Sequence, residues 1–260
     1  IKEFFDESGI PKNLFQVITG DGSTGAALID SGINKMVFTG SVNVGRKVGA
    51  ACGERLIPCT LELGGKAPAV VLPNANLERT ARAILWGAFA NCGQTCVSVE
   101  RVYAHEDVYD KLLDRVVELT NSLRLGDPSS GEIDMGAMPF AKQIDIVDDL
   151  VQDAKAKGAK ILTGGQRSEA PLRSYLPTVI GDATQDMRVM REEIFGPVVP
   201  FMKVQDVEEA IHLANDSHLG LSAYVYGGNK SQARKVAARI QAGTVQINDV
   251  MSSYGFAELP

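Results

Sequence analysis

The sequence is poor in several features that define whole classes of protein. It holds four cysteines, three histidines and one tryptophan in 260 residues. No apolar run approaches the roughly 18 residues that a membrane-spanning helix requires, and residues 1–5 do not form the apolar core of a signal peptide. Lysine and arginine are scattered along a chain of net charge −6, so no basic surface for nucleic acid or a membrane is indicated. We therefore expect a cytoplasmic globular protein.

The four cysteines do not form the pattern of a disulfide framework or of a metal site. Disulfide frameworks are typical of small secreted chains with more cysteines for their length. Cys92 and Cys96 are one residue further apart than a common C-x-x-C pair, and no second close pair of cysteine or histidine occurs. We expect no metal. The thiols are then either buried structural groups or reactive ones.

Segments of strand and helix character alternate along the chain, which predicts an α/β fold. Strands are predicted at residues 14–19, 35–39, 58–63, 67–72, 101–104, 160–163, 199–203, 222–226 and 244–248. Helices are predicted at residues 24–31, 42–53, 77–90, 107–121, 143–157, 207–216 and 230–241. The stretch up to residue 63 is typical of successive β-α units in a doubly wound sheet.

Two glycine-rich turns are candidates for binding phosphate, because each follows a predicted strand and precedes a predicted helix. Residues 20–25 match the dinucleotide fingerprint G-x-G-x-x-G, yet no acidic residue stands in a strand about twenty residues further on. Glycine also simply builds turns. In residues 40–45 (GSVNVG), Ser41 can cap the next helix and leave its first N–H groups free for phosphate. A helix cap without a ligand is the alternative there.

Cys96 ends a short turn that carries glycine and glutamine, after the helix predicted at residues 77–90. A thiol in such a turn can be partly exposed, and an accessible thiolate is a good nucleophile. An ordinary thiol is mostly protonated at pH 7, so catalysis would need a base, a cation or helix N–H groups nearby. A buried structural cysteine is the alternative, and we interpret Cys92 as non-catalytic.

Glu62 lies at the end of an apolar strand, just before two glycines. Partial desolvation there would raise the pKa of its carboxyl group towards that of a general base. A solvated glutamate at a strand end is the alternative.

Four segments together resemble the NAD(P)-dependent aldehyde dehydrogenase superfamily, and the resemblance runs along essentially the whole chain. They are residues 38–45 (FTGSVNVG), 61–66 (LELGGK), 89–96 (FANCGQTC) and 192–198 (EEIFGPV). The resemblance implies an oxidoreductase that converts a small aldehyde to a carboxylic acid with NAD or NADP. It implies the C-terminal part of a cofactor-binding domain at residues 1–64 and a catalytic domain, incomplete at its C-terminus, at residues 65–260. The parent protein is expected to be a homodimer or homotetramer.

The same resemblance implies roles for individual residues. Cys96 would attack the aldehyde to give a thiohemiacetal and then a thioester, and Glu62 would activate the water that hydrolyses the thioester. The expected cofactor contacts are Gly40, Ser41 and Gly45 at the pyrophosphate, Glu193 at the ribose hydroxyls, Phe195 at the nicotinamide ring, and Leu63. Lys66 is expected to be structural, Glu192 to be solvated and Asn248 to line the active site.

Two other functions stay open on the sequence alone: a cofactor-independent thioesterase or acyltransferase that uses Cys96, and a non-catalytic structural module. The presence of Glu62 favours water as the acyl acceptor, because acyl-CoA-forming members of the family generally lack a glutamate at this position.

Members of the resembled family are longer than this chain. The upstream P-W-N-type segment, whose asparagine helps to bind the oxyanion, has no counterpart here, and neither has the F-G-G segment that follows Pro260 in the family. We therefore expect little dehydrogenase activity from these residues alone. We also expect an unfinished nucleotide-binding sheet with an exposed edge near Leu14 or Lys35. The aldehyde, and the choice between NAD and NADP, are not specified.

Overall fold

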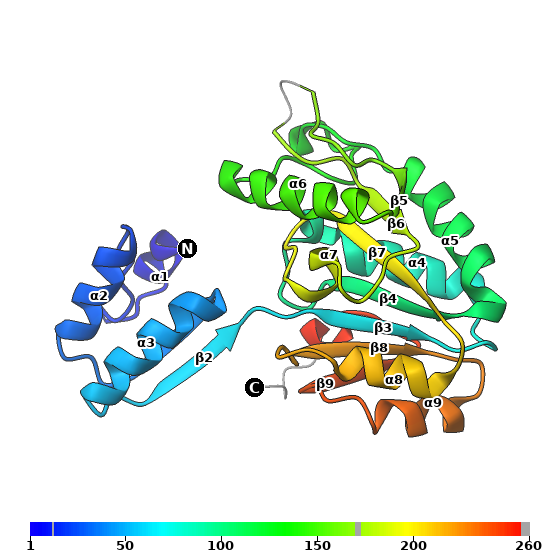
Figure 1. Ribbon diagram of the computed structural model, residues 1–260. Helices are drawn as coiled ribbons and strands as arrows, with labels where there is room; N and C mark the ends of the chain where they lie inside the picture. The colour runs from blue at the N-terminus through cyan, green and yellow to red at the C-terminus, as the bar shows by residue number, and fades with distance from the viewer. Residues whose placement is uncertain (12, 170–172, 256–260) are drawn as a thin grey trace. The chain divides into compact units, whose positions relative to one another are not determined.

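The computed structural model describes residues 1–11, 13–169 and 173–255, and contacts divide the chain into two units, Ile1–Leu63 and Gly64–Pro260. The boundary lies beside the one expected at residue 64. Strands and helices alternate in both units, so the predicted α/β fold is confirmed (Figure 1). No helix among the described residues is long and apolar enough to cross a membrane.

The first unit is built around a β-α-β motif. Its elements are α1 (Lys2–Glu7), α2 (Gly22–Asp30), β1 (Met36–Gly40), α3 (Val42–Glu54) and β2 (Cys59–Leu63). The two strands are parallel and pair from Met36 with Cys59 to Gly40 with Leu63. Helix α3 connects them and buries Gly45 and Cys52. Both strands and the helices α2 and α3 begin within two residues of the predicted positions.

The prediction of a strand at residues 14–19 is wrong. The structure has no strand there, and the side chains of Leu14 and Ile18 are 71% and 64% exposed. A strand needs a hydrogen-bonding neighbour, and in the described part of this unit β1 pairs only with β2. The small sheet has two strands, so β1 and β2 each have one unpaired edge within the described residues of this unit. An open edge near Lys35 agrees with the prediction, whereas no strand edge forms near Leu14 in the part that the structure describes.

The second unit contains a seven-stranded sheet. Its strands are β3 (Ala67–Val71), β4 (Val99–His105), β5 (Lys160–Thr163), β6 (Thr178–Gly181), β7 (Val198–Val204), β8 (Ser222–Tyr226) and β9 (Thr244–Ile247). Its α-helices are α4 (Leu77–Phe89), α5 (Glu106–Asn121), α6 (Ala141–Ala156), α7 (Arg188–Arg191), α8 (Val207–Asn215) and α9 (Lys230–Ala237). Short 3-10 turns are η1 (Ala90–Gly93), η2 (Pro128–Ser130) and η3 (Ser252–Gly255).

The strand order in this sheet is β5-β6-β7-β4-β3-β8-β9, and only β5 runs antiparallel to its neighbour. Every residue of the neighbouring strands β3 and β8 is buried. Strand β3 leads through α4 to β4 on one side, whereas β8 leads through α9 to β9 on the other. Right-handed crossovers in opposite directions place the two helices on opposite faces of the sheet, as Figure 1 shows.

Three elements were not predicted from the sequence: α1, β6 and α7. Each has six residues or fewer. Short segments show little helical or strand period, so their prediction is uneven: β5 and β9, with four residues each, were predicted, whereas these three were not. Helix α9 also ends at Ala237, before the predicted residue 241.

Candidate active site

Cys96 lies beyond a tight turn at the end of α4. The helix ends at Phe89, and Asn91, Cys92 and Gly93 follow with φ angles of 53°, 58° and 68°. Left-handed backbone at two successive non-glycine residues costs of the order of 1–3 kcal/mol each. Such strained backbone persists only where the surrounding structure holds it in place, and it is found most often at functional sites.

The two neighbouring cysteines have different surroundings. Cys92 is buried, its thiol donates to the carbonyl of Gly136 at 3.4 Å, and burial raises the pKa of this thiol. Cys96 is half-exposed. The chain after it is anchored by the Tyr224 hydroxyl, which donates to the carbonyl of Val97 at 2.6 Å. Cys96 is therefore the more exposed cysteine of this pair.

Gly64 and Gly65 allow two parts of the site to approach each other closely. A Cβ atom on Gly65 would lie 2.3 Å from the carbonyl oxygen of Cys96, and one on Gly64 would lie 2.3 Å from the carboxylate of Glu193. The Gly65 amide donates to Glu193 Oε1 at 3.0 Å. At Gly65 the close atom belongs to the backbone, so only glycine allows this approach, whereas at Gly64 the close atoms are the end of the flexible Glu193 side chain.

The segment that carries Glu193 and Phe195 packs on the turn before Cys96. A Cβ atom on Gly93 would lie 2.2 Å from the carbonyl oxygen of Gly196. Phe195 is half-buried and has a left-handed φ of 48°. The structure thus brings together three of the four motif segments, at residues 64–66, 92–96 and 193–196, within one unit.

Glu193 is half-buried, and its burial raises the pKa of its carboxyl group to about 7. The nearby charge of Glu100 adds to this increase, while the Gly65 amide and the Lys66 ammonium oppose it. A carboxyl group with such a pKa can change its charge in the physiological pH range.

A buried ion pair of Lys66 and Glu100 supports this segment, and no sequence motif indicates that the two residues pair. Lys66 Nζ lies 2.9 Å from Glu100 Oε2, and both side chains are almost fully buried. The Glu100 carboxylate also accepts the amides of Ile194 and Phe195, at 2.9 Å and 2.8 Å. Burial lowers the pKa of Lys66, although the Glu100 charge opposes this. Lys66 is structural, as expected, and Glu100 is the unpredicted partner.

Glu192 is exposed and paired with Arg188 at 2.7 Å, as expected of the solvated neighbour of Glu193.

Arg101, like Glu100, was not singled out from the sequence. It is buried, and its Nε donates to the carbonyl of Lys66 at 2.9 Å. The only sign of this network in the sequence is a charged pair, Glu100 and Arg101, at the start of an apolar strand.

In the first unit, Ser41 caps α3. Its Oγ accepts the Val44 amide at 3.4 Å, and its carbonyl accepts the Gly45 amide at 2.8 Å. A Cβ atom on Gly45 would lie 2.4 Å from the Leu63 side chain, so this glycine lets Leu63 pack on the first turn of the helix. Gly40 ends β1 directly before the cap. These four residues form one cluster at the helix N-terminus.

The other glycine turn is occupied by its own carboxylate. Asp21 caps α2 and accepts the amide and hydroxyl of Ser23, at 2.9 Å and 2.6 Å. Because a negative charge already lies at this helix N-terminus, the Ser41 cap is the better candidate for phosphate.

Glu62 lies in β2, opposite Thr39 of β1, and its side chain is exposed.

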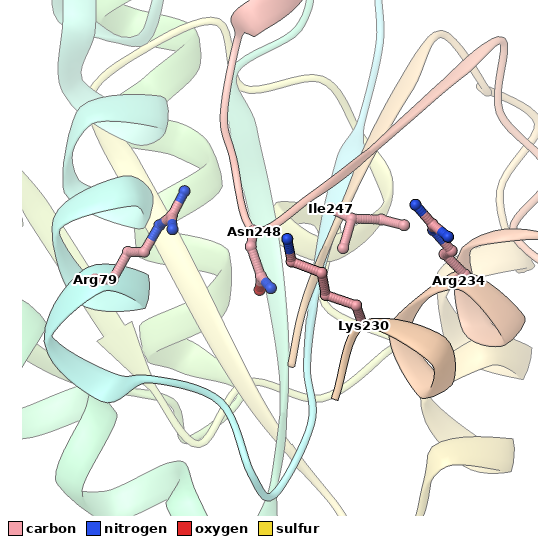
Figure 2. A pocket seen from close by; sticks show the side chains of 5 residues that line it. All are labelled: Arg79, Lys230, Arg234, Ile247 and Asn248. Atoms are coloured by element: carbon pink, nitrogen blue, oxygen red, sulfur yellow. The ribbon is translucent and has the colours of Figure 1, made fainter. Parts of the chain in front are cut away.

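Asn248 lies at the far end of the sheet from Cys96. Cys96 precedes the amino end of β4, whereas Asn248 follows the carboxyl end of β9, and these strands run parallel within one sheet. Asn248 lines a separate hollow with Arg79 and Lys230 (Figure 2). The expectation that it lines the site of Cys96 is therefore wrong, because parallel strands place their two ends at opposite edges.

The fold and the accessible thiol place the chain among α/β proteins with a candidate nucleophilic cysteine. Comparison with known proteins then shows the family: the aldehyde dehydrogenase family model matches residues 1–256, and the chain belongs to this family. The resemblance indicated by the sequence motifs is confirmed.

Individual relatives agree with this assignment. The chain is 40% identical over 264 residues to a 4,4'-diapolycopene aldehyde oxidase of Methylomonas sp, a match that covers 100% of this chain and 48% of the relative. It is 37% identical over 251 residues to the D-glyceraldehyde dehydrogenase (NADP(+)) of Thermoplasma acidophilum, with 94% and 50% covered. The crystal structure of an NAD-dependent aldehyde dehydrogenase from Sinorhizobium meliloti superimposes with a TM-score of 0.92 at 36% identity, with 96% and 50% covered. The chain thus spans about half the length of these relatives.

Proposed function

We propose that the chain provides the nucleophilic thiol and part of the cofactor site of an enzyme that oxidises an aldehyde to a carboxylic acid with NAD or NADP. The observation that carries the proposal is the half-exposed Cys96, held in a turn against Gly65 while Cys92 is buried. The two dehydrogenases named above are described as NADP(+)-dependent and NAD-dependent, which supports this cofactor class.

The chemistry begins at Cys96. Its thiolate forms a bond to the aldehyde carbon, and the carbonyl oxygen becomes an oxyanion. The carbon then loses a hydride and becomes a thioester carbon; NAD(P)+, when bound, supplies the hydride acceptor. Glu62 takes a proton from a water molecule that attacks the thioester, and the carbon–sulfur bond breaks to release the acid and the thiolate. The role of Glu62 depends on its place in the L-E-L-G-G-K segment of the family.

Each unit, taken by itself, has residues that fit part of a nicotinamide dinucleotide. Glu193 Oε1 is bound by the Gly65 amide, and its second carboxylate oxygen has no hydrogen-bond donor among the described residues, so it can accept a ribose hydroxyl. Phe195 is half-buried beside it in sequence and can support the ring. In the first unit, the cap at Ser41, with Gly40, Gly45 and Leu63, offers the free N–H groups of α3 to a pyrophosphate.

For the parent protein we retain a homodimer or homotetramer and a cytoplasmic location, both of which depend on family membership alone.

The test is aldehyde-dependent formation of NAD(P)H by the natural protein that contains this chain. Cys96→Ala should abolish turnover, whereas Cys92→Ala should keep activity within about tenfold, because a buried thiol has no contact with substrate. Unchanged turnover in Cys96→Ala would overturn the proposal.

A further inference from the structure

The strand order of the second unit creates a crevice that the proposed chemistry does not use. Strands β3 and β8 are neighbours, but their connections leave in opposite directions, through α4 and α9 on opposite faces. In open α/β sheets, ligands bind outside the carboxyl ends of the strands at such a switch point. Cys96 and Gly65 lie at the opposite, amino ends of these strands.

The structure has a hollow at this switch point. Two adjoining cavities, of about 260 Å³ and about 280 Å³, share Arg79, Lys230 and Asn248 in their walls. Arg79 comes from the first turn of α4, Lys230 from the first turn of α9, and Asn248 from the end of β9. Arg234, one turn further along α9, and Ile247 complete the wall seen in Figure 2.

The crevice carries a concentration of positive charge in an acidic protein. Arg79, Lys230 and Arg234 are exposed, and no ion pair joins any of them to a carboxylate in the described part of the chain. Most other arginines have a carboxylate within reach, namely Arg55, Arg82, Arg115, Arg124, Arg167, Arg188, Arg191 and Arg239. Two further exposed arginines, Arg46 and Arg173, have no ion pair within the described ranges and line neither cavity. The net charge of the chain is −6, yet no acidic residue is among the described residues that line the two cavities.

The helix termini increase this positive potential. The N-terminal end of an α-helix carries a partial positive charge and favours anions. Lys230 occupies the first turn of α9, which contains no acidic residue. Arg79 occupies the first turn of α4, where the acidic residue, Glu78, is bound by Arg82 and Arg115 instead. Acidic side chains are usually favoured at a helix N-terminus, but here each of the two N-termini carries a cationic side chain. An anion bound between Arg79 and Lys230 would reduce the repulsion between these cations and the positive ends of the helices.

The rest of the wall is held in place by hydrogen bonds. Asn248, with a left-handed φ of 55°, donates to the carbonyl of Gly227 at 2.8 Å and accepts the Gly227 amide at 2.9 Å. The Gly228 amide is bound by Asn74 at 3.1 Å. Asp249, which follows Asn248, is exposed, and its carboxylate accepts the Val250 amide. Hydrogen bonds therefore hold the backbone of the crevice wall in place. The three cationic side chains have no carboxylate partner among the described residues.

We propose that this crevice binds a phosphate group, either free phosphate or the phosphate of a small metabolite. Two guanidinium groups and an ammonium group match an anion with two or more negative charges. One guanidinium group can donate two parallel hydrogen bonds to two oxygens of the same phosphate. The cavities are larger than one phosphate ion, and Ile247 provides an apolar wall for an attached group. The site is separate from the thiol chemistry and does not depend on it.

The test is calorimetric titration of the chain with inorganic phosphate, pyrophosphate and a phosphate monoester at low ionic strength, with sodium chloride at equal ionic strength as the blank. We expect saturable binding of at least one phosphate compound at one site. Arg79→Gln and Arg234→Gln should each weaken it about tenfold or more. The matched controls, Arg82→Gln on α4 and Lys235→Gln on α9, remove the same charge outside the crevice and should weaken binding less than about threefold.

Circular dichroism of each variant shows whether it is folded. Stronger binding of pyrophosphate or the monoester than of inorganic phosphate would identify a metabolite as the source, and equal binding would identify free phosphate; both support the proposal. Absence of saturable binding of all three, or an equal loss in the control variants, would overturn it. Binding of an acidic peptide in the absence of phosphate binding would overturn it too.

Discussion

The ammonium group of Lys66 lies 2.9 Å from a carboxylate oxygen of Glu100, and the same carboxylate accepts the amide of Phe195. One buried ion pair therefore links the glycine segment before β3 to the segment that carries Glu193 and Phe195. Both side chains are almost fully buried, so neither charge can be hydrated if its partner is removed.

Lys66→Met should destabilise the second unit by about 3–5 kcal/mol, because it leaves the Glu100 carboxylate buried without its counter-charge. Urea unfolding followed by circular dichroism measures this. Lys160→Met is the control: Lys160 is paired with Asp182 but its side chain is 70% exposed, so its loss should cost less than about 1 kcal/mol. Equal effects of the two substitutions would show that the buried pair has no special importance.

Gly65→Ala should destabilise the chain by about 2 kcal/mol or more, since the new methyl group would lie 2.3 Å from the rigid backbone carbonyl of Cys96. Gly53→Ala, near the end of α3, meets no atom within 4 Å and should be neutral or slightly stabilising. The same unfolding measurement compares the two. A neutral Gly65→Ala would mean that the Cys96 turn can move away freely, against the rigid arrangement described here.

The carboxyl group of Glu193 should make the second unit less stable as the pH rises. Its pKa is raised from 4.5 to about 7 in the folded chain. The folded state therefore keeps the proton more tightly, so the stabilisation is complete below about pH 4.5 and is lost as the pH rises through about 7.

Glu193→Gln removes this titration and should gain about 1–2 kcal/mol of stability at about pH 8 relative to about pH 5, after allowance for partial exposure. Urea unfolding at both pH values provides the measurement. The exposed neighbour offers the control, Glu192→Gln, which should not give this pH-dependent gain. A gain of the same size at both pH values would contradict the raised pKa.

Glu62→Gln should separate the two halves of the proposed reaction. Thioester formation needs Cys96 but not the general base, so the natural protein that contains this chain should give one rapid equivalent of NAD(P)H per site. Turnover after that should be slower by a factor of ~10²–10⁴. Rapid-mixing absorbance records both phases. Loss of the rapid phase would show that Glu62 acts before hydrolysis.

The sequence predicted the parts of the site whose chemistry depends on short motifs. Cys96 stands in one segment with recognisable residue types at fixed spacing, and Glu193 and Phe195 stand in another; the structure gathers both segments, with Gly65, in one unit. The cap at Ser41 was likewise predicted from a hydroxyl residue before a helix.

What the sequence did not predict depends on contacts between distant residues. Lys66 and Glu100 are 34 residues apart, and no local pattern indicates that they pair. The strand expected at residues 14–19 has suitable residues but no pairing neighbour in the described part of its unit. The position of Asn248 follows from parallel strand direction, which only the assembled sheet reveals.

The central claim, that Cys96 is the nucleophilic thiol of this chain, is tested most directly by a short pulse of iodoacetamide followed by mass spectrometry, with and without NAD. We expect labelling of Cys96 to be at least about tenfold faster than that of buried Cys92, and to change when NAD is present. Slow, uniform labelling of Cys52, Cys59, Cys92 and Cys96 with no effect of NAD would contradict the account.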